Sequence, residues 1–146
     1  MANFYNDSVS VLGLKARRKM SEIDLRPGAT DPAKTGVAGG EYCYWIAIRQ
    51  DDKAYISSPR DREIVVLQLA GNVSVAARIP VRGLPNRLLL NRAQNRLFTA
   101  LDNSDTVAVI DRDRVIATFD VTAPAGLLPS RQRSQRRQPE FPGALT

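Results

Sequence analysis

Residues 62–67 read Arg-Glu-Ile-Val-Val-Leu, and residues 105–110 read Asp-Thr-Val-Ala-Val-Ile. Both stretches place aliphatic and β-branched residues directly after a polar turn, which is the composition of a β-strand. The first stretch is apolar at four consecutive positions, and so is Leu88-Leu89-Leu90 at three, as expected for strands that are buried on both faces of their sheet. From Ile64 to Val107 the spacing is 43 residues, which indicates a repeated unit.

The same pattern opens the chain, where residues 6–12 read Asn-Asp-Ser-Val-Ser-Val-Leu. Each of the three copies is followed by a second extended stretch, and two further pairs of strand candidates lie between the copies. No window of a dozen residues shows helical spacing with caps, so the sequence predicts an all-β protein. Four short strands per period of about 40–45 residues are typical of a β-propeller blade. The expected strands span 8–14, 20–25, 44–48, 53–58, 63–69, 75–81, 86–90, 96–101, 106–111 and 114–121.

Three short motifs add a family resemblance. Residues 97–111, which run from Leu-Phe-Thr-Ala to Thr-Val-Ala-Val-Ile-Asp, are similar to the core of a YVTN repeat, and residues 2–12 resemble the same core. Gly83-Leu84-Pro85-Asn86 stands where that family has Gly-x-Pro before its innermost strand. From Ala2 to about Val121 the chain therefore resembles the YVTN-type β-propeller repeats. It departs from them at Cys43, which occupies the position of Pro85.

These patterns predict a partial β-propeller of about two and a half four-stranded antiparallel blades. Residues 2–25 would form the last two strands of an incomplete blade, 26–43 an inter-blade insertion, 44–81 and 82–121 two complete blades, and 122–146 a disordered basic tail. We expect the remaining blades to be missing, so that the chain is a piece of a longer protein. Outer sheet faces, including Val66, Leu67 and Val109, would then lack neighbours. The Gly- and Pro-rich stretch 27–40 is expected to be exposed and mobile.

Histidine is absent from the sequence, which removes the commonest general base and metal ligand. The single cysteine, Cys43, lies among aromatic residues and is interpreted as a small buried hydrophobe. A carboxylate pair drawn from Asp102, Asp105 and Asp111 is the open alternative, although Asp at turns usually accepts backbone hydrogen bonds. No catalytic residue, cofactor or metal site is therefore predicted.

The net charge of +6 is unevenly distributed along the chain. Residues 129–146 contain four arginines against one glutamate, and the rest of the chain mixes both signs. A solvated surface explains these charges, so nucleic-acid binding is not predicted. Apolar runs are only a few residues long, which excludes a membrane span. The N-terminal residues 1–8, Met-Ala-Asn-Phe-Tyr-Asn-Asp-Ser, are unlike a secretory signal.

In a propeller, the turns between the second and third strands share a face with the connections between blades. This face is the predicted binding surface for a protein or a small ligand, as part of a non-catalytic scaffold. The alternative is a parent hydrolase, lactonase-like or with a phosphoesterase domain, whose catalytic residues lie outside this chain. The family resemblance implies a bacterial, often exported parent, and the localisation is otherwise unknown. The candidate residues are Asn3, Tyr5, Tyr42, Arg60, Asp61, Asn86, Arg87, Asn103 and Asp105.

Overall fold

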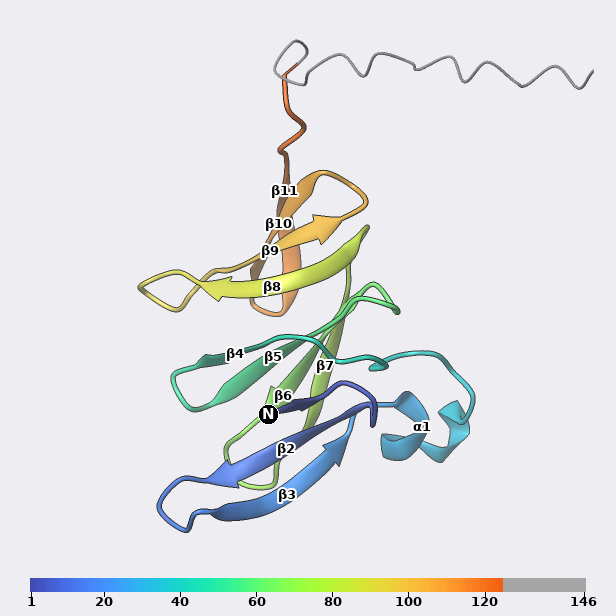
Figure 1. Cartoon of the computed structure of the whole chain (residues 1–146), viewed down its shortest axis with the longest axis vertical. Helices are drawn as coiled ribbons and strands as arrows, with labels where there is room; N and C mark the ends of the chain where they lie inside the picture. Colours follow the sequence, from blue (N-terminus) through green and yellow to red (C-terminus); the bar gives the residue numbers. More distant parts are fainter. Residues whose placement is uncertain (125–146) are drawn as a thin grey trace, which may run out of the picture.

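The computed structural model describes residues 1–124, and the predicted disordered tail lies outside this range from residue 125 onward. The described chain folds into three antiparallel sheets stacked face to face (Figure 1). The first sheet contains β1 (Ala2–Asn3), β2 (Ser8–Gly13) and β3 (Arg18–Asp24). The second contains β4 (Ile46–Arg49), β5 (Lys53–Ser58), β6 (Glu63–Gln68) and β7 (Ser74–Pro80). The third contains β8 (Leu84–Leu90), β9 (Leu97–Asp102), β10 (Thr106–Asp111) and β11 (Arg114–Asp120).

The all-β prediction is confirmed, and each of the ten expected strands coincides with an observed strand to within two residues. The chain contains one strand that was not predicted, because Ala2 and Asn3 form β1 and pair with β2. Within residues 1–124 the only helices are α1 (Pro27–Thr30) and the 3-10 turn η1 (Pro32–Lys34), each about one turn long. None of the described helices is long and apolar enough to cross a membrane.

The three sheets repeat one another in detail. In each sheet the last two strands pair with a β-bulge at the same place, immediately after Val11, Val66 and Val109. The last two of these residues lie 43 positions apart and the first two 55 apart, so the first interval is longer by twelve residues. This excess falls in the connection between β3 and β4, as the predicted insertion requires. Because bulges fix register, they align every strand residue of one sheet with its counterpart in the next.

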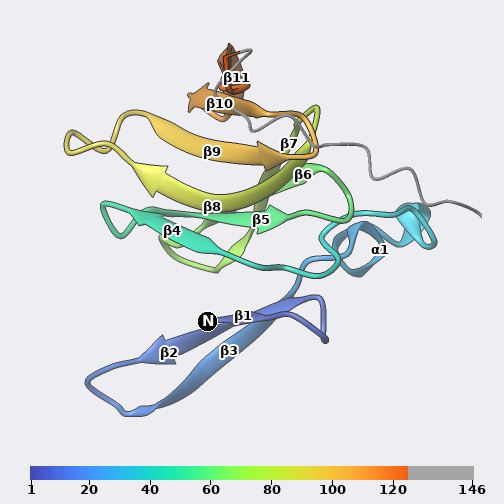
Figure 2. The same cartoon turned by 45° about the horizontal axis from the view of Figure 1, so that its top comes forward.

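Two apolar cores hold the stack together. Between the first and second sheets, Val9 and Ile23 pack with Ile56, Val65 and Leu67. Between the second and third sheets, Tyr55, Ile64, Val66 and Ile79 pack against Leu88, Leu97, Leu101, Ala108 and Ile110. The second sheet is therefore covered on both faces (Figure 2), which explains why Ile64, Val65, Val66 and Leu67 are all fully buried.

This arrangement corrects two expectations about buried faces. Val66 and Leu67 do not lie on uncovered faces, because the first and third sheets cover them, and Val109 is only 5% exposed. The run Leu88-Leu89-Leu90 looked like a strand buried on both faces, yet the side chain of Leu89 is 69% exposed. Among residues 1–124, the third sheet is covered on one face only, so alternate residues of β8 point away from the core.

The insertion is exposed from residue 32 to 38, as predicted, but its two ends are pinned to the core. Glu63 forms an ion pair with Arg78 at 2.6 Å, and its carboxylate also accepts a hydrogen bond from Gly40 N at 2.7 Å. Arg78 in turn donates to the carbonyl of Leu25. Gly40 has φ +70°, and a side chain there would collide with Leu25. The glycine therefore serves a close backbone approach in addition to a turn.

A second polar cluster joins the second and third sheets at the opposite end of the strands. The hydroxyl of Tyr55 donates to Asp113 Oδ1 at 3.0 Å, and Lys53 forms an ion pair with the same carboxylate. Asp113 lies in the tight β10–β11 turn with φ +58°. Burial, reinforced by the adjacent carboxylate, raises the pKa of Tyr55 to about 12. The cluster therefore favours the protonated phenol.

We expect the free energy of unfolding to fall at high pH because of the raised pKa of Tyr55. The unfolded phenol titrates near its ordinary pKa of 10.0, whereas the folded phenol titrates at about 12. Between these values the unfolded state loses a proton that the folded state keeps, so the stabilisation is complete below pH 10 and is lost as pH rises toward 12. Urea unfolding should show that the free energy of unfolding declines between pH 8 and pH 11.5. This decline should be smaller in Tyr55→Phe than in the wild type by about 1–2 kcal/mol. Parallel declines in the two proteins would contradict this assignment.

Candidate binding surface

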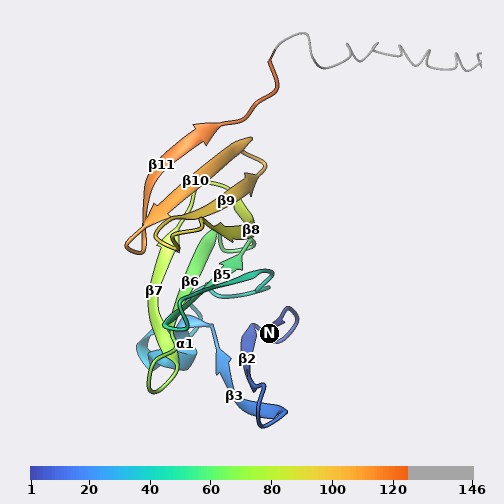
Figure 3. The same cartoon turned by 90° about the vertical axis from the view of Figure 1, so that its left-hand side faces the viewer.

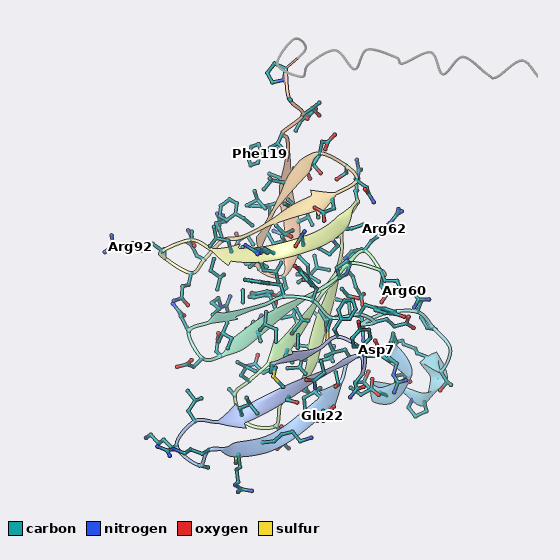
Figure 4. All side chains as sticks on the ribbon, in the orientation of Figure 1. Asp7, Glu22, Arg60, Arg62, Arg92 and Phe119 are labelled. Atoms are coloured by element: carbon teal, nitrogen blue, oxygen red, sulfur yellow. The ribbon has the colours of Figure 1, made fainter. Side chains whose placement is uncertain are left out.

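Equivalent turns of the three sheets lie at the same end of the strands. The side of the stack that these turns form is called the insertion face. The turns end at Asp7, Arg62 and Asp105, which have φ values of 51°, 53° and 47°. Each of these residues accepts a 2.8 Å backbone hydrogen bond at its carbonyl, from Leu25, Val81 and Val121 respectively. The bond ties each turn to the residue that follows its sheet's last strand. In Figure 4, Asp7, Arg60 and Arg62 lie on the side where α1 lies, and Arg92 lies on the other side.

Residues 41–43 cross this face between the first two sheets and are held by side chains of both. Asp61 accepts a hydrogen bond from Glu41 N at 2.8 Å, and Asp7 accepts one from Tyr42 N at 2.9 Å. Cys43 follows, fully buried, with its thiol donating to the carbonyl of Ser8 at 3.1 Å. Burial raises the pKa of the Cys43 thiol, which supports its interpretation as a structural hydrophobe. These anchors fix the side chain of Tyr42 at the surface.

An aromatic and arginine cluster forms around Tyr42. The Phe4 ring meets the Tyr42 ring at a centroid distance of 5.2 Å and the Tyr5 ring at 5.1 Å, both edge to face. The guanidinium of Arg60 lies 5.0 Å from the centroid of the Tyr42 ring and forms an ion pair with Glu41 at 3.1 Å. Phe4, Tyr42, Pro59 and Arg60 line a hollow of about 500 Å³. We call these residues, with Tyr5, the Tyr42 cluster.

A second aromatic pair lies where the first strands of the second and third sheets approach each other. The guanidinium of Arg87, on β8, lies 5.0 Å from the centroid of the Trp45 ring, just before β4. Tyr44 lies beside Trp45 at a centroid distance of 6.3 Å. The backbone of Trp45 is fixed because its N–H donates to Ser57 Oγ at 3.0 Å. Both aromatic rings are exposed at the surface.

The two faces of the stack carry opposite charge. At the turns and strand ends of the insertion face, nine acidic side chains outnumber five basic ones; on the opposite face ten basic side chains outnumber four acidic ones. The insertion face contains Asp7, Asp24, Asp31, Glu41, Asp61, Glu63, Asp102, Asp105 and Asp120 with Arg26, Lys34, Arg60, Arg62 and Arg82. The opposite face contains Lys15, Arg17, Arg18, Lys19, Arg49, Lys53, Arg92, Arg96, Arg112 and Arg114 with Asp51, Asp52, Asp111 and Asp113. The strand order separates charges that are mixed along the sequence.

The predicted surface residues divide into three groups. Tyr5, Tyr42 and Arg60 meet in the Tyr42 cluster, and Asp61 supports it through Glu41 N. Arg87 lies in the second aromatic pair.

The other four predicted residues form local contacts. Asn3 donates to Ser8 and Ser10 on the outer side of the first sheet, and Asn86 donates to Asp102 at 2.8 Å. Asn103 and Asp105 belong to the β9–β10 turn of the third sheet, apart from both aromatic groups.

Sequence reasoning missed Phe4, Glu41 and Trp45. Phe4 is adjacent to the predicted Tyr5, and Trp45 is one of the aromatic residues that flank Cys43 in the sequence. The repeated turn position could have identified Phe4, because it begins the same turn that contains Arg60 in the second sheet. Trp45 and Arg87 are 42 residues apart in the sequence, and no local signal marks the contact between them.

The side chains on this surface are suited to binding a partner by direct contact. The carboxylates of Asp7 and Asp61 accept hydrogen bonds from backbone N–H groups. Within residues 1–124 there is no group of three or more cysteine, aspartate or glutamate side chains that is arranged to hold a metal ion. Exposed phenol, indole and guanidinium groups instead offer flat apolar area with polar tips.

No protein-family model and no curated protein matches the chain. Solved structures do match, and hydrazine synthase from Kuenenia stuttgartiensis superposes with a TM-score of 0.64 at 14% sequence identity. The superposition covers 80% of this chain and 30% of the matched chain, so this chain spans under a third of the matched chain's length. At this identity the likeness shows a shared fold and leaves function to be argued from the surface.

Proposed function

We propose that this chain forms part of a β-propeller and acts as a non-catalytic scaffold that binds a protein partner on its insertion face. The observation that carries the proposal is the Tyr42 cluster, an exposed group of three aromatic rings and one arginine on the face where equivalent turns converge.

The propeller arrangement is supported by the repeat. The three sheets share strand direction, bulge position and turn conformation, and the last strands β7 and β11 lie on one side of the stack while β8 lies on the other (Figure 3). Propellers are built from such sheets arranged radially around an axis, with each first strand innermost. The YVTN-type resemblance of the sequence leads to the same arrangement.

A protein partner is supported by the kind of residues at the surface. Tyr, Trp and Arg are the residues that most often contribute binding energy at protein interfaces, because they combine a large rigid contact area with a polar group. The acidic excess on the insertion face favours a partner segment that is basic around an apolar or aromatic anchor. The hollow lined by Phe4, Tyr42, Pro59 and Arg60 is open enough to accept one such anchor side chain.

The test uses a displayed library of short peptides, selected on the whole chain. Selected peptides should contain basic residues flanking an aromatic or aliphatic residue. The variant Phe4→Ala/Arg60→Ala should weaken their binding about 10- to 100-fold in calorimetry, because truncating an interface anchor costs about 2 kcal/mol. Trp45 is the single tryptophan, so its fluorescence reports whether a peptide reaches the second aromatic pair.

Arg92→Ala, on the opposite face, is the matched control and should change the affinity less than twofold. A loss of binding in the Arg92 variant as large as in the Phe4/Arg60 variant would place the binding surface elsewhere. Acidic peptides emerging from the selection would contradict the predicted chemistry of the partner.

A further inference from the structure

The outer face of the third sheet repeats the pattern of a face of the second sheet, the one that packs against the third sheet. The register aligns Ala47, Tyr55, Ile64, Val66 and Ile79 of the second sheet with Leu89, Phe98, Val107, Val109 and Phe119 of the third. In the second sheet these positions pack against the third sheet, and Ile79 is 2% exposed. In the third sheet they are again apolar, and Leu89 and Phe119 are 69% and 56% exposed, whereas Val109 on β10 is 5% exposed. The outer face of the third sheet is therefore suited to pack against one more sheet in the same way.

The first sheet presents the complementary side of that interface. Register aligns its Asn3, Ser10 and Leu12 with Leu101, Ala108 and Ile110, which face the second sheet from the third. Leu12 is 48% exposed, and Leu14, at the tip of the β2–β3 hairpin, is 87% exposed. In Figure 4, Glu22 lies at the first-sheet end of the stack and Phe119 at the third-sheet end. The two free faces therefore lie at opposite ends of one molecule.

The polar residues of the first-sheet face fit the same pattern. Ser8 and Glu22 align with Glu63 and Arg78, the ion pair that lies at the interface between the first and second sheets. Ser8 donates to Glu22 at 2.6 Å, and Asn3 donates to Ser10 at 2.9 Å, so these buried serines are already satisfied. The first-sheet face is therefore polar near the insertion face, where the second sheet has Glu63 and Arg78, and apolar near the hairpin tip.

We propose that two copies of the chain associate head to tail, with the third sheet of each copy docking on the first sheet of the other. Two such contacts close a ring of six sheets, within the range of four to eight blades found in propellers. This inference rests on the proposed propeller arrangement. According to this inference, a second copy of the same chain covers the outer face that contains Leu89 and Phe119.

Sedimentation equilibrium of the whole chain at about 50 µM should give the mass of two chains. Leu89→Glu, on the third sheet, and Leu14→Glu, on the first, should each convert the protein to a monomer at that concentration, because each disrupts both contacts of the ring. Arg62→Glu, at an exposed position in the β5–β6 turn of the second sheet, serves as a control outside either face and should stay dimeric. Near-UV circular dichroism checks that every variant keeps its fold.

A monomeric wild type would overturn the inference, as would higher polymers in place of a closed dimer. If Leu14→Glu remained dimeric while Leu89→Glu did not, the third sheets would pack on each other, and the head-to-tail arrangement would be wrong. These outcomes are distinguishable from failure of the proposed function, because peptide binding to the Tyr42 cluster can be measured on the monomeric variants.

Discussion

Replacing Ile79 with alanine is expected to lower the free energy of unfolding by about 3 kcal/mol, within the range of 2–5 for a buried isoleucine. Ile79 is 2% exposed and lies in the core between the second and third sheets. Truncation removes apolar area from that core and leaves a cavity between two sheets, around which the structure relaxes only in part. Urea unfolding followed by Trp45 fluorescence measures the change.

The matched control is Phe119→Ala, at the position that aligns with Ile79 in the third sheet. Phe119 is 56% exposed, so in the monomer its truncation should cost less than about 1 kcal/mol. Both variants are compared at concentrations low enough to keep the chain monomeric. Equal losses would mean that the outer face of the third sheet is covered within one molecule, and the stacking order described above would be wrong.

Replacing Gly40 with alanine is expected to destabilise the protein by about 3 kcal/mol or more. A Cβ at this position would lie 2.2 Å from the carbonyl oxygen of Leu25, and the backbone has φ +70°. Relieving the clash requires the insertion to move away from Leu25, which disturbs the hydrogen bond from Gly40 N to Glu63. The cost therefore combines backbone strain with loss of the Glu63–Arg78 clamp. Urea unfolding of the variant measures it.

Gly36→Ala separates these two causes. Gly36 also has a positive φ, of 83°, but a Cβ there would meet nothing within 4 Å. Its substitution should cost about 1 kcal/mol, the price of the left-handed backbone alone. If the two variants were equally destabilised, the close approach of the insertion to Leu25 would carry no energetic weight.

The strands could be predicted from the sequence because each one is a local pattern. Ile64-Val65-Val66-Leu67 and the alternation of Val9 with Val11 require no distant information, and turn residues mark both ends of most strands. The short strand β1 was missed because two residues carry no period. It exists only because Ala2 and Asn3 pair with Val9 and Ser8.

Part of the candidate surface could be predicted in the same way. Tyr5, Arg60 and Asp61 were found because they occupy a repeated turn, and repetition in the sequence implies a common face in the fold. Asn103 and Asp105 occupy the same turn in the third sheet, yet the Tyr42 cluster forms at the turns of the first and second sheets. Which turn receives the aromatic cluster depends on the path of residues 41–43 across the face.

The amino-acid sequence by itself determined the all-β class, the strand positions, the repeat of 43 residues and the location of the insertion, because these follow from short-range hydrophobic period and turn chemistry. Only the tertiary structure decided which apolar rows are covered, how the charges separate onto two faces, and which aromatic rings meet an arginine. These properties depend on contacts between sheets. Residues such as Ile79 and Phe119 have the same local pattern and differ only in whether a neighbouring sheet lies above them.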